Sequence, residues 1–143
     1  MTPEALARAC ADAMWRTDQA SAGLGMRLEE IRPGAARLSM RVEPRMLNGQ
    51  GSCHGGFIFA LADSAFAFAC NTTGTASGAN HCLITSLRPV TAGEELMATA
   101  EERQREGRSG IYDVRVTSGE AVVAEFRGFS RTTGAKLDLS HAG

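Results

Sequence analysis

The segment MLNGQGSCHGGFIFALADSAFAFACNTTG, residues 46–74, passes from a glycine-rich loop into a long apolar run. The loop covers residues 44–56, and the run from Phe57 to Cys70 is apolar apart from Asp63 and Ser64. Because this run is long for a strand and rich in alanine, we predict a helix. A helix that is apolar on every side must be buried on most of them. The rest of the chain therefore has to cover it.

Strands are predicted on both sides of this helix, where apolar and polar residues alternate with a period of two. They are Met26–Ile31, Leu38–Val42, Ala79–Leu87, Leu96–Glu106, Ile111–Thr117 and Ala121–Arg131, with a hairpin turn at Ser118-Gly119. Another helix is predicted over residues 3–20 and a polar, frayed tail over 132–143. We expect a single α+β domain, residues 1–143, in which an antiparallel sheet wraps around one long central apolar helix, the hotdog fold.

Size and charge narrow the classes of function. With 143 residues, the chain has room for one domain that folds without a disulfide or a metal. Its formal net charge of −1 predicts no binding to nucleic acid or to an anionic membrane. The N-terminal residues lack the order of a signal peptide, and no run of about 20 apolar residues is present. A cytoplasmic location with reduced cysteines is therefore expected.

Asp63 is the sharpest chemical feature of the sequence. Its neighbours within one helical turn are apolar or small, and burying a carboxylate without a partner costs several kcal/mol. Carboxylates perturbed in this way cluster at functional sites. The plainer alternative is that Asp63 lies on a wet strip of the helix or pairs with an arginine.

The second feature is the loop from Asn48 to Gly56 that leads into the helix. Glycines let a ligand come close to the backbone, and free N–H groups at the start of a helix bind anions or oxyanions. Such donors stabilise the tetrahedral intermediate of acyl transfer. The alternative is an ordinary flexible connection into a helix.

Spacing links these two features. Asp63 follows Gly56 by seven residues, which puts both on one helix face about 10.5 Å apart along the axis. A carboxylate and an oxyanion donor must each lie ~3 Å from the reacting carbonyl, so one helix cannot supply both. We therefore expect a homodimer whose active site takes glycine amides from one subunit and Asp63 from the other.

Residues 46–74, with LRPVTAGEELMATA, GRSGIYDV and AEFRGFSR, resemble the phenylacetyl-CoA thioesterases of the PaaI type over about Leu24 to Arg131. The resemblance implies the hotdog fold, a dimer of dimers (a homotetramer), and no metal or organic cofactor. It implies an acyl-CoA substrate with an aryl-acetyl group, such as phenylacetyl or a hydroxylated derivative, and a role in phenylacetate catabolism. It also implies catalytic residues, which fall on Asp63, Gly55, Asn48 and His54.

The mechanism that this resemblance implies uses each of these residues. The Gly55 N–H polarises the thioester carbonyl, and Asp63 of the opposing subunit attacks that carbonyl or activates a water that does. Asn48 holds the water or the carboxylate, and His54 orients the thioester or the loop.

Coenzyme A carries three phosphate groups, so a local cationic edge is expected. Candidate substrate-binding residues are Gly56, Arg88, Arg103, Arg105, Arg108, Ser109, Gly110 and Arg131. The alternative for any one arginine is a solvated charge at a strand edge. The Cys53-His54 and His81-Cys82 pairs lack the spacing of a zinc site, so no metal is expected. His81 is interpreted as a pocket-lining or structural histidine.

Two other functions are compatible with the same fold, because fold alone does not determine function. A hotdog hydroxyacyl-thioester dehydratase would pair a histidine with a carboxylate, but the spacing of His54 and Asp63 resembles the thioesterase loop instead. A non-catalytic acyl-CoA-binding module would bind thioesters without turnover, and Asp63 would then be replaceable by Asn.

Overall fold

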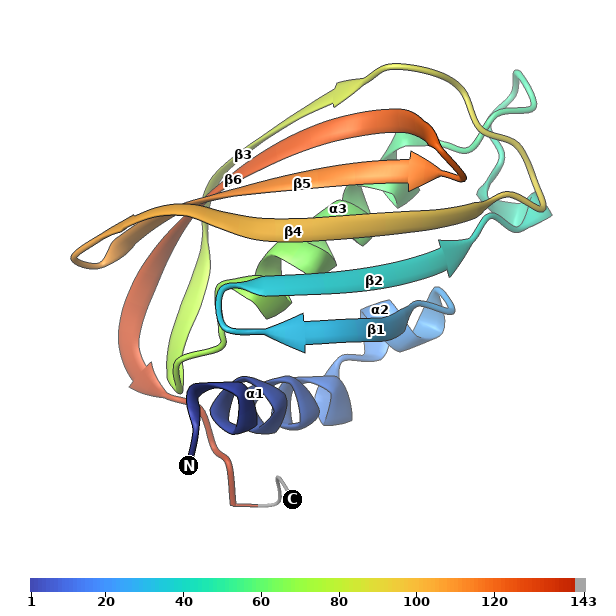
Figure 1. Cartoon of the computed structure of the whole chain (residues 1–143). Helices are drawn as coiled ribbons and strands as arrows, with labels where there is room; N and C mark the ends of the chain where they lie inside the picture. The colour runs from blue at the N-terminus through green and yellow to red at the C-terminus, as the bar shows by residue number, and fades with distance from the viewer. Residues whose placement is uncertain (141–143) are drawn as a thin grey trace.

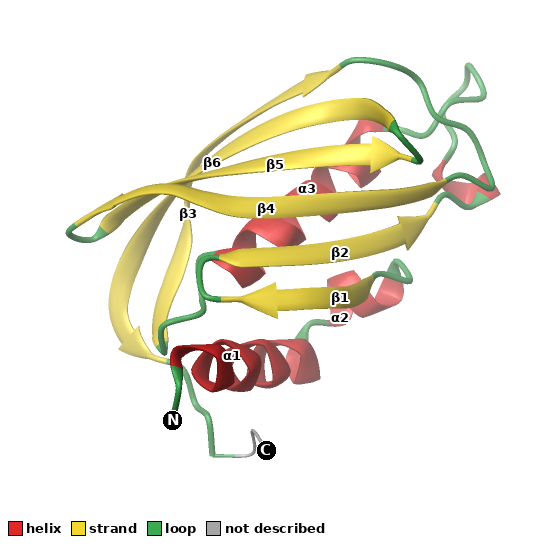
Figure 2. Ribbon diagram, in the orientation of Figure 1, coloured by secondary structure: helices red, strands yellow, loops and turns green. Residues whose placement is uncertain are grey.

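The structure is a computed structural model that describes residues 1–140. One antiparallel sheet of six strands curves around a long helix (Figure 1, Figure 2). The helices are α1 (Pro3–Thr17), α2 (Gln19–Gly23) and α3 (Gly55–Ala69), with a 3-10 turn at Pro44–Met46. The strands are β1 (Arg27–Arg32), β2 (Ala35–Arg41), β3 (Thr75–Ser86), β4 (Glu95–Glu106), β5 (Ser109–Ser118) and β6 (Ala121–Lys136). The predicted α+β hotdog fold is confirmed.

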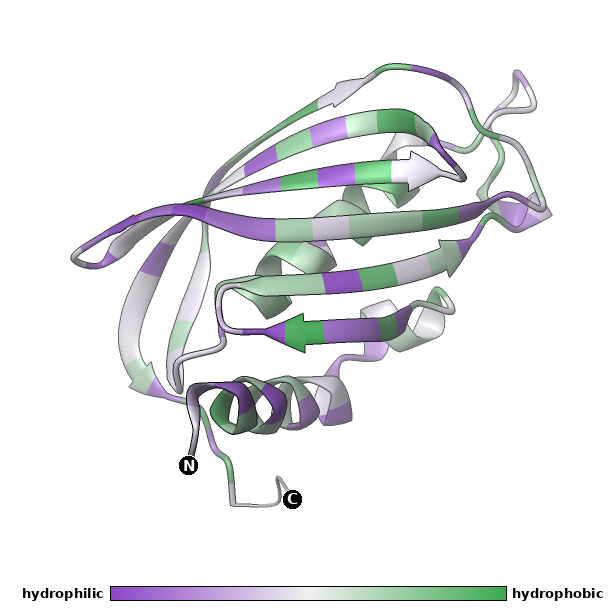
Figure 3. Ribbon diagram, viewed as in Figure 1, coloured by the Kyte–Doolittle hydropathy of each residue, from purple (hydrophilic) through white to green (hydrophobic). Residues whose placement is uncertain are grey.

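The strand order is β1-β2-β4-β5-β6-β3, and every neighbouring pair is antiparallel. Alternation predicted correctly which side chains of the central strands point toward α3. Leu96, Ala98 and Ala100 of β4 are completely buried, and so are Val114 and Val116 of β5. Figure 3 shows this alternation along the strands, whereas α3 is pale to green along its length.

The core forms where the apolar α3 meets the inner face of the sheet. Phe66 of α3 packs against Tyr112 and Phe126, with ring centroids 5.7 and 5.8 Å apart. The Phe66 ring lies directly over Gly128 of β6, where a Cβ atom would approach the ring carbons to 2.7–2.8 Å. The missing side chain at Gly128 therefore lets α3 lie close to the sheet.

The N-terminal helix differs from the prediction of one helix over residues 3–20. Helix α1 ends at Thr17, and α2 begins at Gln19, so the helix is interrupted at Asp18. The Asp18 carboxylate accepts hydrogen bonds from the backbone N–H of Ser21 at 2.9 Å and from its hydroxyl at 2.7 Å. Asp18 is thus the N-cap of a new helix, a role that its short acidic side chain favours over a helix interior.

The polar tail predicted over 132–143 is wrong for its first part. Strand β6 continues to Lys136, which pairs with Thr75 at the start of β3. Strand β3 also begins at Thr75 and not at the predicted Ala79, so β3 and β6 are both longer than predicted. The start of β3 and the end of β6 are both polar, and each is a strand because the other supplies its hydrogen-bond partners. The pattern of residues within one segment does not reveal such a partner. Residues 141–143 of the predicted tail lie outside the described residues.

A buried asparagine joins the end of α3 to β3. The side-chain amide of Asn71 donates to the carbonyl of Ala67 at 2.8 Å and to that of Ser77 at 3.0 Å. Its oxygen accepts the Ser77 N–H at 2.7 Å. These bonds set where β3 begins relative to α3.

The two edges of the sheet differ. Strand β1 carries charged side chains in ion pairs, such as Arg32 with Glu30 at 2.8 Å, and α1 packs against it (Figure 1). Strand β3 has 12 residues and contains no Asp, Glu, Lys or Arg, and among residues 1–140 its outer edge pairs with no other strand. Proteins usually protect an edge strand with acidic or basic side chains or with a covering element, and within residues 1–140 β3 has no Asp, Glu, Lys or Arg and no further strand beside it.

Gly128→Ala tests the packing of Phe66 on the sheet. The added methyl group would overlap the Phe66 ring, so the free energy of unfolding should fall by about 1–3 kcal/mol. Urea unfolding measures the change. Gly78→Ala is the matched control, because no atom lies within 4 Å of the added methyl group. It should change the free energy by less than about 0.5 kcal/mol, and equal effects of the two substitutions would contradict the packing described.

Candidate active site

Asp63 lies midway along α3, on the face that is turned toward β6 and β3. Phe59 and Phe66, one helical turn on either side of it, both pack against Phe126 of β6, at 5.5 and 5.8 Å between ring centroids. Asp63 therefore shares one helix face with Phe59 and Phe66.

The Asp63 carboxyl group is half-buried, and within residues 1–140 it has no hydrogen bond and no ion pair. Loss of water contact raises the pKa of Asp63 above its ordinary value, because burial disfavours the charged form. The arginine pairing considered from the sequence is absent from the described residues. An unpaired, partly desolvated carboxylate is a stronger base than one in water.

Cys82 of β3 lies near enough to Asp63 for the carboxylate charge to act on its thiol. Burial, and then the nearby Asp63 charge, raise the pKa of the Cys82 thiol. Cys82 is not among the residues that the sequence predicts for the site. The alternation of β3 could have predicted that Cys82 points inward, since Cys82 and Ile84 are half-buried and pack on the core.

The start of α3 leaves one amide free. His54 is the N-cap, and its Nδ1 accepts the Gly56 N–H at 2.9 Å, while its carbonyl accepts the Phe57 N–H at 3.0 Å. The Gly55 N–H has no acceptor among residues 1–140. Gly56, predicted to bind the substrate, therefore has its amide engaged by His54. Gly55 remains the donor that a ligand can use.

Asn48 organises the loop before α3. Its side-chain oxygen accepts the N–H groups of Gln50 at 2.9 Å and Ser52 at 3.2 Å, and its own N–H donates to the Ser52 carbonyl at 2.7 Å. The oxygen is thus used within the loop, and the side-chain NH2 group is the part left to contact a water or a carboxylate.

Gly55 opens onto a hollow of about 330 Å³. Its other lining residues are Cys53, Ile58, Ser86, Leu87, Arg88 and Pro89. Leu87 is 55% exposed, which is unusual for a large apolar side chain. Arg88 lies 3.5 Å from Glu94 at the rim. The hollow therefore combines an apolar wall, a free amide and a cation.

The remaining predicted substrate-binding residues lie elsewhere. Arg108, Ser109 and Gly110 belong to the β4–β5 hairpin and the start of β5, at the other end of the sheet from the start of α3 (Figure 1). Arg131 of β6 pairs with Ser109 there. Arg108 and Arg131 donate to the Thr132 carbonyl and the Ser109 hydroxyl, at 3.1 and 3.4 Å. One chain thus does not bring these residues to Gly55.

Arg103 and Arg105, the other two arginine candidates, are engaged with acidic side chains. Arg103 lies 2.9 Å from Asp113, and Arg105 lies 4.0 Å from Glu102. His81 stacks on Phe129 of the neighbouring strand, with ring centroids 5.3 Å apart.

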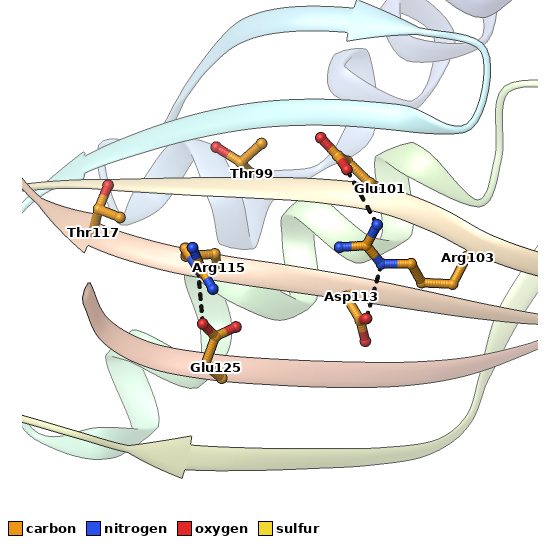
Figure 4. Close-up of a pocket in the computed structure, with 7 residues that line it drawn as sticks. All are labelled: Thr99, Glu101, Arg103, Asp113, Arg115, Thr117 and Glu125. Carbon is orange, nitrogen blue, oxygen red and sulfur yellow. Dashed lines mark hydrogen bonds and ion pairs between the residues drawn. The ribbon is translucent and has the colours of Figure 1, made fainter. Parts of the chain in front are cut away.

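The sheet also has a charged hollow of about 450 Å³ on the face away from α3 (Figure 4). Its charges are already paired, as in Arg115–Glu125 at 2.7 Å. It lies across the sheet from Asp63 and has no part in the site described above.

Within residues 1–140, no three His, Cys, Asp or Glu side chains are grouped so that they could hold a metal ion. No helix in that part of the chain is long and apolar enough to cross a membrane.

Comparison with known proteins identifies relatives that match most of the chain. Residues 50–125 match the sequence model of the thioesterase superfamily. The acyl-coenzyme A thioesterase PaaI of Escherichia coli is 42% identical over 128 residues, which cover 89% of this chain and 91% of that protein.

Solved structures agree with this match. The E. coli PaaI protein from the phenylacetic acid degradation operon superposes with a TM-score of 0.92 and 40% identity, over 94% of this chain and 99% of that one. A mutant of the phenylacetic acid degradation protein PaaI from Thermus thermophilus has a TM-score of 0.78 and 38% identity, over 80% and 98%.

Asp63→Asn tests the desolvation of Asp63. A carboxyl group whose pKa is raised by folding destabilises the folded state when it is ionised. Asp63→Asn should therefore raise the free energy of unfolding at pH 7. The gain should vanish as the pH falls through the raised value and below the ordinary value of 3.8, where Asp63 is neutral as well.

Urea unfolding at pH 7 and pH 3 measures this gain. Asp12→Asn removes an exposed carboxylate of α1 and should stay within about 0.5 kcal/mol of the native protein at pH 7. A gain for Asp63→Asn that is the same at both pH values would rule out ionisation as its cause.

Proposed function

The chain belongs to the thioesterase superfamily and is an acyl-CoA thioesterase, and we propose that it hydrolyses aryl-acetyl-CoA thioesters with Asp63 as its nucleophile or general base. The observation that carries this proposal is the unpaired, half-buried carboxyl group of Asp63, on the helix face that it shares with Phe59 and Phe66. Phe66 is fully buried against the sheet, but the half-buried Phe59 ring suits contact with an aromatic acyl group. The names of the E. coli and Thermus relatives favour phenylacetyl-CoA or a hydroxylated derivative, and thus a role in phenylacetate catabolism.

In the reaction we propose, the Gly55 N–H donates to the thioester carbonyl oxygen and stabilises the charge that develops on it. Asp63 either attacks the carbonyl carbon, forming a mixed anhydride that water then cleaves, or removes a proton from the attacking water. The C–S bond breaks with the electron pair on sulfur, and CoA leaves as a thiolate. Because a thiolate is a stable leaving group, no second acid is required.

The two groups must come from different subunits. Gly55 and Asp63 are eight residues apart on the continuous helix α3, about 12 Å along its axis. We propose that two chains pair along the open β3 edges, which would extend the sheet across the dimer. A two-fold axis there places the α3 start of one subunit toward the middle of its partner's α3.

The same symmetry bears on the CoA phosphates. Arg88 lies at the Gly55 hollow, whereas Arg108 and Arg131 lie at the far end of the sheet. Antiparallel pairing of β3 would turn the far end of one subunit toward the Gly55 end of the other. We propose that Arg108 and Arg131 of the partner, with Ser109 and Gly110, bind the CoA phosphates. Pairing of dimers into a homotetramer and a cytoplasmic location stay predictions.

His54 does not serve the dehydratase alternative. Its Nδ1 accepts the Gly56 N–H at 2.9 Å, and it caps the helix that carries Asp63 nine residues later. The use of Nδ1 as a helix cap, together with the 42% identity to an acyl-CoA thioesterase, favours the thioesterase over the dehydratase.

Asp63→Ala should lower kcat for phenylacetyl-CoA hydrolysis by about 10²–10⁴-fold, because the group that activates the nucleophile is removed. A thiol-release assay across aryl and alkyl acyl-CoAs measures this loss and the acyl preference. Asp12→Ala, which removes an exposed carboxylate of α1, should keep the native rate. Equal rates for Asp63→Ala and the native protein would refute the mechanism and support a site elsewhere.

A mixture of two inactive variants tests the shared site. Gly55→Pro removes the N–H donor at the first helical position, where proline is tolerated, and Asp63→Asn removes the carboxylate. Equimolar variants that are unfolded and refolded together should recover about a quarter of the native activity, because half of the dimers are mixed and each has one intact site. Mixed dimers without activity would show that each subunit supplies both groups.

A further inference from the structure

The loop between β3 and β4, residues 87–94, is the support for the loop that leads into α3. The Cys53 N–H donates to the Val90 carbonyl at 2.7 Å, and the Thr91 hydroxyl donates to the Gly51 carbonyl at 3.2 Å. Val90 is 2% exposed and anchors this contact in the core. These hydrogen bonds hold the backbone two residues before the free amide of Gly55.

A single carboxylate organises the supporting loop. One oxygen of Glu94 accepts the Thr91 N–H at 2.7 Å, and the other accepts the Ser118 hydroxyl at 2.7 Å. The turn between Thr91 and Glu94 needs Gly93, whose φ of +94° is unfavourable for other residues. The Ser118 and Thr91 hydrogen bonds, with a smaller contribution from Arg88, keep the pKa of Glu94 below its ordinary value.

Glu94 therefore connects three parts of the molecule. Through Ser118 it is attached to the end of β5, through Thr91 to the loop that contacts Gly51, and through an ion pair of 3.5 Å to Arg88 at the hollow. Its backbone carbonyl also accepts the Val42 N–H at 2.9 Å at the end of β2. No part of its side chain lines the Gly55 hollow.

We propose that Glu94 is a positioning residue for catalysis, which holds the Gly55 amide in line with the thioester carbonyl by bracing residues 90–91 against residues 51–53. The proposal rests on the oxyanion role of Gly55 proposed above. An oxyanion donor is effective when its direction is fixed before the reaction. A displacement of about 1 Å in such a group lowers the rate on the order of 100-fold.

Two substitutions of Glu94 separate bracing from charge. Glu94→Ala removes both hydrogen bonds, so kcat for the best acyl-CoA substrate should fall about 10- to 100-fold. KM should change less than about 2-fold, because the donor acts mainly in the transition state. Glu94→Gln can accept from Thr91 and donate to Ser118, so it should keep kcat within about 3-fold of the native value.

A milder variant, Ser118→Ala, tests the proposal even if Glu94→Ala does not fold. Ser118→Ala leaves the Thr91 hydrogen bond in place and should lower kcat a few-fold. Combined with Glu94→Ala it should lower kcat no further, because both act through one brace. Glu125→Ala is the matched control, since Glu125 of β6 pairs with the exposed Arg115 at 2.7 Å on the face of the sheet away from α3 and from the hollow. It should leave kcat unchanged.

Amide hydrogen exchange follows the brace independently of catalysis. The Cys53 N–H, bonded to the Val90 carbonyl, should exchange about 10-fold faster in Glu94→Ala and at the native rate in Glu94→Gln. Unchanged exchange together with native kcat would overturn the proposal. Faster exchange with native kcat would also overturn it, because the loop would then move without affecting catalysis.

The kinetic outcomes also distinguish this proposal from the proposed function. Equal losses of kcat in Glu94→Ala and Glu94→Gln would show that the charge beside Arg88 matters and not the brace, which overturns the positioning role while Gly55 and Asp63 keep theirs. Native rates in Gly55→Pro would overturn the oxyanion role, and the positioning role with it. A preference for another acyl group would alter the substrate used in the assay and nothing else.

Discussion

Burial of the apolar helix α3 is the constraint on which the rest of the structure depends. Strands β2, β4, β5 and β6 turn their apolar side chains toward it. Because Gly128 has no side chain, the Phe66 ring can lie against the sheet. The same burial acts on the one carboxyl group of this helix. Asp63 loses water without gaining a partner among the described residues, and its raised pKa follows directly. Packing and reactivity thus have one physical cause.

Helix α3 carries both reactive features but separates them. Its start presents the free Gly55 amide, because His54 engages the amide of Gly56. Its middle presents Asp63, and the rigid rise of the helix keeps the two apart. The uncharged β3 edge offers the surface along which a second chain would supply the missing half. Under this proposal the assembly is part of the active site.

The loops at the start of α3 are held by polar side chains and not by apolar packing alone. Asn48 ties its own turn together, and Glu94 links the β3–β4 loop to the end of β5. A catalytic amide on a loop needs such a frame, because its direction and not its mere presence determines how well it stabilises an oxyanion. Under the mechanism proposed for Gly55, the polar residues around it therefore have a structural role that serves the chemistry.

The sequence by itself determined the buried helix and the inward face of β4 and β5, because these depend on periodicity. It also identified Asp63 as a candidate catalytic residue, because burying a charge is costly. It did not reveal the break at Asp18, the pairing that extends β6 to Lys136, or the separation of Arg108 and Arg131 from Gly55. Only the tertiary structure decided that His54 accepts the Gly56 N–H and that the charge of Asp63 acts on Cys82. The physical reason is distance along the chain. Periodicity is a property of neighbouring residues, whereas strand partners and charge–charge interactions involve segments that are far apart in the sequence.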